Sequence, residues 1–203
     1  MKENEFVLHD FVVQSCLIDP QFNEYGELMP ANTPGQLMYD NTVNSFELIQ
    51  NLAHQSFYEG IAKDIHRCLT TGIAWFENNN ASGIYRKENV SVDGRPCPSY
   101  MFVDFLIRER WFNKISEQIS NYDGTRANAL EIAWNAHHAF EYIHPFIDGN
   151  GRTGRLLLNY ILLMLKQEPV VVWSHDKESY YESIRVFEHK VNDYLTLGSN
   201  WSM

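Results

Sequence analysis

The chain has 203 residues, of which 44% are hydrophobic and 14% aromatic, enough apolar surface to bury the core of one domain. It carries 26 acidic and 16 basic residues, for a formal net charge of -10. This balance argues against a nucleic-acid partner, because sequence-independent affinity for nucleic acid comes largely from Lys and Arg side chains that neutralise phosphates.

Residues 1–44 are interpreted as an N-terminal extension. Residues 5–18 have the pattern of a short amphipathic helix, and residues 19–41 gather Pro, Gly and Asn as a connecting segment. The first residues have mixed charge and no continuous apolar stretch, and no run of about 18 apolar residues occurs, so we expect neither a signal peptide nor a membrane span. The expected location is cytoplasmic. Secretion as an effector without a signal peptide stays open.

The main domain is expected over residues 45–198, followed by a tail of residues 199–203. Apolar residues recur three and four apart over residues 45–69, which predicts one or two helices. Residues 78–96 break this period. There Ile84-Tyr85-Arg86 and Val90-Ser91-Val92 are short strand-like runs, and Asp93-Gly94 has the composition of a turn, so we predict one short hairpin.

Helical period returns after the predicted hairpin. We expect helices over residues 99–118 and 126–143, a nearly apolar helix in the centre of the core over 154–166, and a last amphipathic helix over 176–195. Long helices with a single hairpin predict the all-α fold class. The three cysteines form no C-x-x-C pair and are odd in number, which argues against a zinc site or a disulfide framework.

Residues 144–155 read HPFIDGNGRTGR, and this segment, called the signature below, has the pattern of a phosphate-binding site. Gly149 and Gly151 let successive backbone N–H groups face one anion, and the helix that follows points its positive dipole end at the same place. Arg152 and Arg155 stand three residues apart in the first turn, so both guanidiniums can reach one polyphosphate.

Two further residues of the signature indicate chemistry at that phosphate. Asp148 would add negative charge beside the phosphate, which makes sense chiefly if it holds a divalent cation such as Mg²⁺. His144, on the other side of the turn, could take a proton from an attacking hydroxyl as a neutral imidazole. Singly, each residue could serve as an ordinary hydrogen-bonded, capping or solvated residue. Together they indicate phosphoryl or nucleotidyl transfer.

The glycines also match G-x-G-x-x-G, the fingerprint of dinucleotide-binding domains. That fingerprint requires a preceding strand, whereas a helical pattern and Pro145 precede the glycines here. We therefore reject the dinucleotide interpretation, and Gly154 is interpreted as a small helical residue without a phosphate role.

The signature matches every position of the HPFx[D/E]GNGRxxR pattern of the Fic family, and the chain resembles that family over residues 45–195. The run from His137 to His144 and the apolar LLLNYILL segment are similar to family members, and residues 83–98 resemble the family's flap. The resemblance implies the Fic fold, a helical core with one short β-hairpin flap. It also implies transfer of AMP from ATP to a Ser, Thr or Tyr hydroxyl of a target protein, with release of pyrophosphate.

The resemblance assigns roles to individual residues. His144 is expected to be the general base and Asp148 the Mg²⁺ ligand. The anion hole is expected at Gly149, Asn150 and Gly151, and the β- and γ-phosphates at Arg152 and Arg155. The flap residues expected to pair with an extended target segment are Ile84, Tyr85, Val90, Ser91 and Val92.

Tyr180-Tyr181 resemble a tyrosine pair that lines the nucleotide pocket in similar proteins, with Tyr181 as the expected contact, although core aromatics of a terminal helix would look the same. Related sequences often carry Asn seven residues after the second tyrosine, where this chain has Glu188. This difference bears on which base the chain binds.

Two alternatives to AMP transfer from ATP stay open. One is a Fic enzyme that uses another donor such as UTP, or that removes AMP, and the other is a non-enzymatic Fic-fold interaction module. Many Fic proteins restrain themselves through an [S/T]xxxE[G/N] helix whose glutamate pairs with the second signature arginine. The nearest match, QSFYEG at residues 55–60, has Gln at its first position and would use Glu59. We expect either constitutive activity or restraint by a separate antitoxin-like protein.

Overall fold

The computed structural model of the protein describes residues 3–18 and 34–195. These residues form α1 (Glu3–Ile18), α2 (Pro34–Leu52), α3 (Ile61–Thr70), α4 (Ala74–Asn78), β1 (Ser91–Val92), β2 (Arg95–Pro96), α5 (Val103–Phe105), α6 (Asn113–Ser120), α7 (Arg126–Ile143), α8 (Asn150–Met164) and α9 (Lys177–Tyr194). Short 3-10 turns cover Tyr100–Phe102 and Ser174–Asp176, and Leu106–Phe112 is π-helical. The predicted all-α class with one small hairpin is confirmed.

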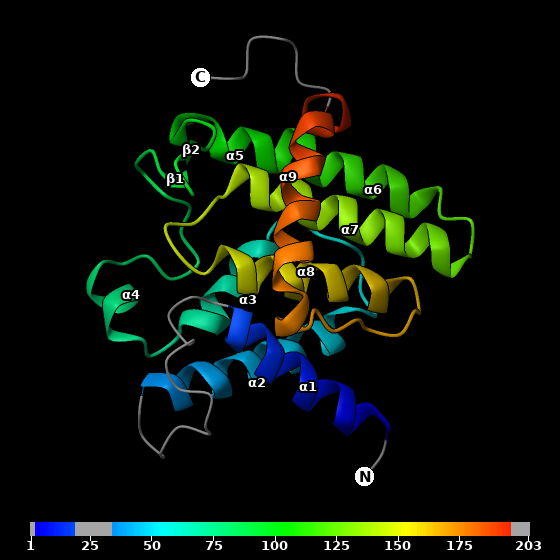
Figure 1. The fold of residues 1–203 in the computed structure, drawn as a ribbon, viewed down its shortest axis with the longest axis horizontal. Coiled ribbons are helices and arrows are strands. Elements are labelled where there is room, and N and C mark those ends of the chain that lie inside the picture. Colours follow the sequence, from blue (N-terminus) through cyan, green and yellow to red (C-terminus); the bar gives the residue numbers. More distant parts are fainter. Residues whose placement is uncertain (1–2, 19–33, 196–203) are drawn as a thin grey trace.

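The core is built around α8, which packs against α7 on one side and against α2 and α3 on the other (Figure 1). Its apolar residues are buried all round the helix, as the continuous run of leucines predicts. The helix begins at Asn150, four residues earlier than predicted, because Gly149 takes a left-handed φ of 77° at its N-terminus. Residues 150–155 of the signature, including both arginines, therefore belong to α8.

Helix α7 has the bounds that the sequence predicts. Thr125 caps its N-terminus by accepting a hydrogen bond from the Asn128 N–H at 3.2 Å. It ends at Ile143 because His144 turns left-handed, with φ 49° and ψ 61°, and Pro145 follows. Helix α9 lies across α7 (Figure 1). The first six residues of the signature thus form the turn that joins α7 to α8.

The hairpin is smaller than predicted. Strands β1 and β2 pair antiparallel, Ser91 with Pro96 and Val92 with Arg95. The predicted turn is correct, since Asp93 and Gly94 both have positive φ. The expectation of a strand at Ile84-Tyr85-Arg86 is wrong, because the Arg86 N–H bonds the carbonyl of Pro145 at 2.9 Å instead of a neighbouring strand. The flap is therefore joined to the signature at its base.

The N-terminal helix α1 begins at Glu3 and packs against α2 and α8. Residues 34–41, predicted as part of a connecting segment, are helical, and α2 runs across the predicted boundary at residue 44. Residues 19–33 and the tail from 199 to 203 lie outside the described residues, and the division into extension and domain stays a prediction. Within the described residues, no helix is long and apolar enough to cross a membrane.

Candidate active site

A cavity of about 370 Å³ opens at the N-terminal end of α8 and collects most of the predicted site. The predicted residues that line it are Val92, His144, Asp148, Gly149, Asn150, Gly151, Arg152, Arg155 and Tyr181. Glu141 of α7 and Tyr180 of α9 also line it, although the sequence predicted no role for the first. Three separate segments of the chain therefore meet at one concave surface.

The turn that enters α8 presents backbone N–H groups to this cavity. Thr153 makes the first intrahelical bond of α8, to the Gly149 carbonyl at 3.0 Å, so the N–H groups before it have no acceptor within the helix. The Asn150 side chain is used within the turn. Its amide donates to the Phe146 carbonyl and its oxygen accepts from the Phe146 N–H, both at 2.9 Å. Only the backbone of Asn150 is left to face an anion.

Asp148 is the carboxylate next to these N–H groups. Its Oδ1 accepts a hydrogen bond from the Gly149 N–H at 2.7 Å. The described residues contain no cluster of three or more side chains that could hold a metal ion. A Mg²⁺ ion at Asp148 would therefore take its other ligands from phosphate oxygens and water, which is how Mg²⁺ is commonly bound beside nucleotides.

His144 stands at the end of α7 with its ring against the cavity. Burial lowers the pKa of His144 to about 4, helped by the charges of Arg86 and Arg95, while a backbone hydrogen bond and Asp148 oppose the shift. The imidazole is therefore neutral at physiological pH and can accept a proton.

Arg86 is a residue of the site that the sequence did not reveal. Its guanidinium is buried, 4% exposed, and donates to four backbone carbonyls. Nε donates to His144 at 2.8 Å, Nη1 to Glu88 at 2.8 Å, and Nη2 to Pro98 and, at 3.4 Å, to Ile143. Arg86 thus joins both ends of the flap to the backbone of His144. In the sequence Arg86 stands directly before the polar residues Lys87 and Glu88, so nothing marks it as buried.

His66 of α3 makes a second connection between the flap and the signature. Its Nδ1 accepts from the Gly83 N–H at 2.9 Å, so Nε2 carries the proton and donates to the Asp148 carbonyl at 3.0 Å. The ring stacks on Phe146 at a centroid distance of 3.8 Å. Burial lowers the pKa of His66 to about 4, which keeps this neutral tautomer in place. The sequence placed His66 only on a helix.

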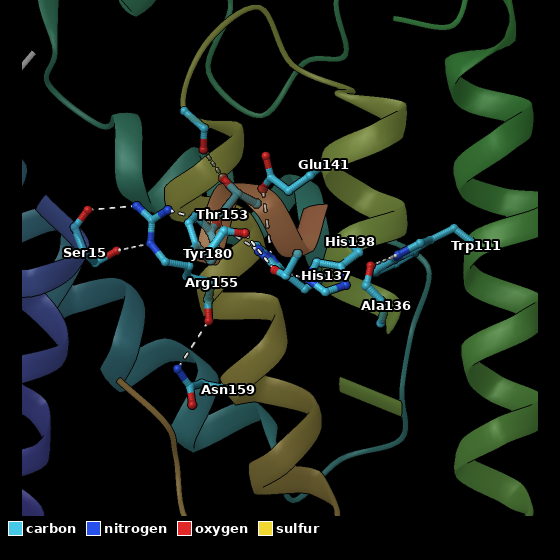
Figure 2. A network of polar contacts seen from close by, with 12 residues as sticks. Ser15, Trp111, Ala136, His137, His138, Glu141, Thr153, Arg155, Asn159 and Tyr180 are labelled. Carbon is cyan, nitrogen blue, oxygen red and sulfur yellow. Dashed lines mark hydrogen bonds and ion pairs between the residues drawn. The ribbon is translucent and has the colours of Figure 1, made fainter. Parts of the chain in front are cut away.

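Arg155 is 3% exposed and is already hydrogen-bonded (Figure 2). Nε donates to the Ser15 hydroxyl at 3.0 Å, Nη2 to the Ser15 carbonyl at 2.8 Å, and Nη1 to the Tyr180 hydroxyl at 3.3 Å. Tyr180 in turn contacts Nε2 of His137 at 2.9 Å. Both tyrosines of the pair border the cavity, and Tyr180 also accepts a hydrogen bond from Arg155.

Glu59 does not approach this arginine. Its Oε1 pairs with Nε of Arg108 at 2.6 Å, and both side chains are half exposed. Arg155 is instead contacted by Ser15 of α1, which lies 140 residues away in the sequence. The match at residues 55–60 therefore offers no contact through which Glu59 could block Arg155.

The flap residues lie in two places. Val92 borders the cavity of about 370 Å³, and Ser91 is exposed on β1. Ile84 and Tyr85 border a separate groove of about 260 Å³ between α4 and the flap. The Tyr85 ring packs on Phe146 at a centroid distance of 5.3 Å. At the other edge of the flap, Arg95 forms an ion pair with Glu188 of α9.

Gly154 is required by the close approach of α7 and α8. A Cβ at this position would lie 2.7 Å from Nδ1 of His137 and closer still to Oε1 of Glu141. We expect Gly154→Ala to lower the free energy of unfolding by about 1–3 kcal/mol through overpacking, measured by urea denaturation. Gly60→Ala is the control, because its Cβ meets only the Tyr58 ring at 3.3 Å.

The clash at Gly154 also predicts coupling between two sites. Adding Glu141→Ala to Gly154→Ala removes the nearest obstructing atom, so the double variant should be more stable than the sum of the two single effects by roughly 0.5 kcal/mol or more. Strict additivity would show that Glu141 does not make this glycine necessary.

The model of the Fic/DOC family matches residues 56–162 of the chain. Among curated proteins, Protein adenylyltransferase Fic of Nematostella vectensis is 34% identical over 110 residues, and that of Drosophila erecta is 37% identical over 106 residues. The matched segments cover 53% and 51% of this chain but only 24% and 20% of those proteins.

Two solved structures show the same fold. A Fic domain containing signaling protein from Bacteroides thetaiotaomicron superposes with a TM-score of 0.77 at 19% identity, over 95% of this chain and 80% of that one. Fic-1 from C. elegans gives a TM-score of 0.64 at 21% identity, over 96% of this chain and 58% of that one. The fold expected from the signature is confirmed.

Proposed function

Because the chain belongs to the Fic/DOC family, we propose that it is a protein adenylyltransferase, which transfers AMP from ATP to a Ser, Thr or Tyr hydroxyl of a target protein. The supporting observation is that a neutral histidine, a carboxylate, a helix N-terminus and two buried arginines meet in one cavity of about 370 Å³. The similar curated proteins carry the name adenylyltransferase, although the chain spans a quarter or less of their length.

In this proposal the target hydroxyl attacks the α-phosphorus of ATP. His144 accepts the hydroxyl proton as the new P–O bond forms, and the bond from the α-phosphorus to the bridging oxygen of the β-phosphate breaks. The leaving pyrophosphate carries the released charge. The protein contributes mainly by positioning these groups and by stabilising charge with fixed dipoles, as is usual for transfers at phosphorus.

The phosphates would be held by groups that line the cavity, and the Gly149 N–H would exchange its bond to Asp148 for one to phosphate. The backbone N–H groups of Gly149, Asn150 and Gly151 would bind the α-phosphate, aided by the positive end of α8. Arg152 and Arg155 would bind the β- and γ-phosphates. To do so, Arg155 must exchange its bonds to Ser15 and Tyr180 for bonds to phosphate oxygens.

Asp148 is proposed to hold a Mg²⁺ ion, which when bound neutralises phosphate charge. We expect Asp148→Asn to shift the Mg²⁺ concentration for half-maximal transfer upward on the order of 10-fold, because a neutral amide is a much weaker ligand than a carboxylate. The measurement is a Mg²⁺ titration of label transfer at saturating ATP, with Asp176→Asn as the surface control. An unchanged titration midpoint would argue against Asp148 as the ligand.

The target protein is proposed to bind along the flap. The edge of β1 at Ser91 can pair with an extended segment in β fashion, which places a hydroxyl near His144 without demanding much target sequence. Ile84, Tyr85 and Val90 would extend this surface along the flap.

A cytoplasmic location is also proposed. None of the three cysteines forms a disulfide, as expected in a reducing compartment.

A second candidate is the same chemistry with another nucleotide. Its basis is Glu188, which stands where related sequences often carry Asn and pairs with Arg95. The test is incubation of cell lysate with α-labelled ATP, UTP and GTP in parallel. Label from ATP that depends on His144 supports the proposed function. Label from UTP alone would exclude ATP as donor, and no label with any nucleotide would favour an interaction module.

Restraint of the enzyme is proposed to come from a separate antitoxin-like protein, or to be absent. Since Glu59 pairs with Arg108, we expect Glu59→Gly to leave auto-modification of the purified protein within about 2-fold of the parent, as for loss of an exposed ion pair. The assay is label incorporation from α-labelled ATP without added target. A sharp rise in this variant would show that the chain restrains itself through Glu59.

A further inference from the structure

The proposed function leaves one buried carboxyl of the cavity without a role. Glu141 lies on α7 four residues after His137, so these two side chains share one face of the helix, and it stands three residues before His144. Its side chain is 9% exposed and borders the cavity that contains the signature. A buried ionisable group in a cleft is a candidate for ligand contact.

Glu141 also borders a second cavity, of about 300 Å³, that adjoins the first. The residues common to both cavities are Val92, Asp93, Glu141, His144 and Tyr181. Beyond them the second cavity extends to Arg95, Ile184, Arg185, Glu188 and His189. Glu141 and His144 therefore stand where one cavity opens into the other.

The order of groups in a nucleoside triphosphate decides how it can occupy these two spaces. The β- and γ-phosphates belong with Arg152 and Arg155, which line the first cavity but not the second. The α-phosphate must lie beside His144 for the proposed transfer. The sugar is bonded to the α-phosphate, so it comes next, at the junction that Glu141 borders, and the base continues into the second cavity.

Glu141 has acceptor capacity that the protein does not use. Among the described residues, no group donates a hydrogen bond to this carboxyl. Its Oε1 is buried against the neutral His137, whose Nδ1 is 4.0 Å away, so Oε2 is the oxygen left to border the cavities. Figure 2 shows the carboxyl standing over His137 beside the network around Arg155. Buried acceptors without donors are rare in folded proteins, and each one calls for an explanation.

The packing of α8 keeps space for this carboxyl. Gly154 faces it, and any side chain there would overlap Oε1 of Glu141. Burial raises the pKa of Glu141 to about 7, against the opposing effect of Arg155 and Arg95. With or without its proton the group retains oxygen lone pairs that can accept a hydrogen bond.

We propose that Glu141 binds the ribose of the nucleotide donor, with its carboxyl accepting a hydrogen bond from a sugar hydroxyl. Carboxylates bind ribose hydroxyls in this way at other nucleotide sites. Asp93, the other carboxylate at the junction, is exposed at the turn of the hairpin and is solvated by water. The inference rests on the proposed function, because it takes the position of the sugar from the phosphate site.

The test is nucleotide binding by calorimetry with Mg²⁺, in a His144→Ala background that prevents turnover. The ligands are ATP, 2′-deoxy-ATP and 3′-deoxy-ATP. We expect the parent to bind ATP about 10-fold or more tightly than the analogue that lacks the bound hydroxyl. In Glu141→Leu the ratio of these two affinities should fall to near 1, because ATP loses its contact to the carboxyl whereas the analogue without that hydroxyl had none to lose. Glu141→Gln should keep part of the ratio, since its amide oxygen still accepts.

Glu131→Leu is the matched control, because Glu131 is exposed on the same helix, and thermal unfolding establishes that each variant is folded. An equal loss for all three nucleotides in Glu141→Leu would overturn the inference in favour of a packing role. So would equal binding of the three by the parent.

Different outcomes test the role of Glu141 and the identity of ATP as the donor. Binding of UTP but not ATP would exclude ATP as donor, and the same comparison with 2′- and 3′-deoxy-UTP would then support or overturn the role of Glu141. Binding of no nucleotide would overturn both.

Discussion

Replacing His144 with alanine is expected to lower kcat for AMP transfer by about 10²- to 10⁴-fold, the usual contribution of a general base. The reason is that the ring is neutral and borders the cavity beside the backbone N–H groups of the signature. Arg155 is held by Tyr180 and Ser15 and does not depend on His144 for its position, so nucleotide affinity should change little. Label transfer and calorimetry measure the two effects.

The control for this variant is His175→Ala, because the His175 side chain is 71% exposed and does not line the cavity. Its transfer rate should equal that of the parent. If His144→Ala retained more than about a tenth of kcat, proton abstraction by this residue would not be a major part of catalysis.

The lowered pKa of His144 predicts the pH dependence of the same step. A base works in its unprotonated form, and a pKa of about 4 means that this form predominates throughout the range from pH 5 to 8. The reactive form is lost only as the pH falls through about 4. NMR of the imidazole, assigned by comparison with His144→Ala, should therefore show no protonation of His144 in the free protein above pH 5.

Replacing Arg86 with methionine is expected to lower the free energy of unfolding on the order of 3–5 kcal/mol, as for removal of one partner from a buried polar cluster. Methionine retains most of the volume but donates no hydrogen bond to the carbonyls that the guanidinium now contacts. The same change should lower kcat, because the left-handed turn at His144 loses the donor that holds its carbonyl. Urea denaturation measures the stability.

Two further variants separate charge from geometry at Arg86. Arg86→Lys keeps the positive charge but lacks the planar guanidinium, so its free energy of unfolding should lie between those of the parent and Arg86→Met. Arg67→Met removes an exposed arginine that pairs with Asp64, and it should cost less than about 1 kcal/mol. A loss at Arg86 no larger than that at Arg67 would mean that the carbonyl cluster does not need its donor.

The fold was largely predictable because helices are encoded locally. A cap at Thr125, an apolar face and Pro145 after the end are enough to bound α7, and a run of leucines is enough to make α8 the central helix. The signature was equally readable, since a tight turn, a helix N-terminus and arginines three residues apart are all properties of twelve consecutive residues. The cavity brings those residues together as expected.

Other parts of the site depend on contacts between segments distant in the sequence, which no local pattern reports. Arg86 and His66 contact backbone carbonyls more than 50 residues away, and a backbone carbonyl leaves no trace in the amino-acid type of its residue. The hydrogen bonds of Arg155 to Ser15 span 140 residues, so nothing in the sequence indicated this contact.

The sequence by itself therefore determined the all-α class, the bounds of α7 and the presence of the signature, because each follows from periodicity, capping or residue order within a short segment. Only the tertiary structure decided three other features. The Asn150 side chain bonds the backbone of Phe146, Gly154 leaves room for the carboxyl of Glu141, and this carboxyl borders both cavities. The physical reason is that packing brings together side chains whose proximity depends on how whole helices are placed.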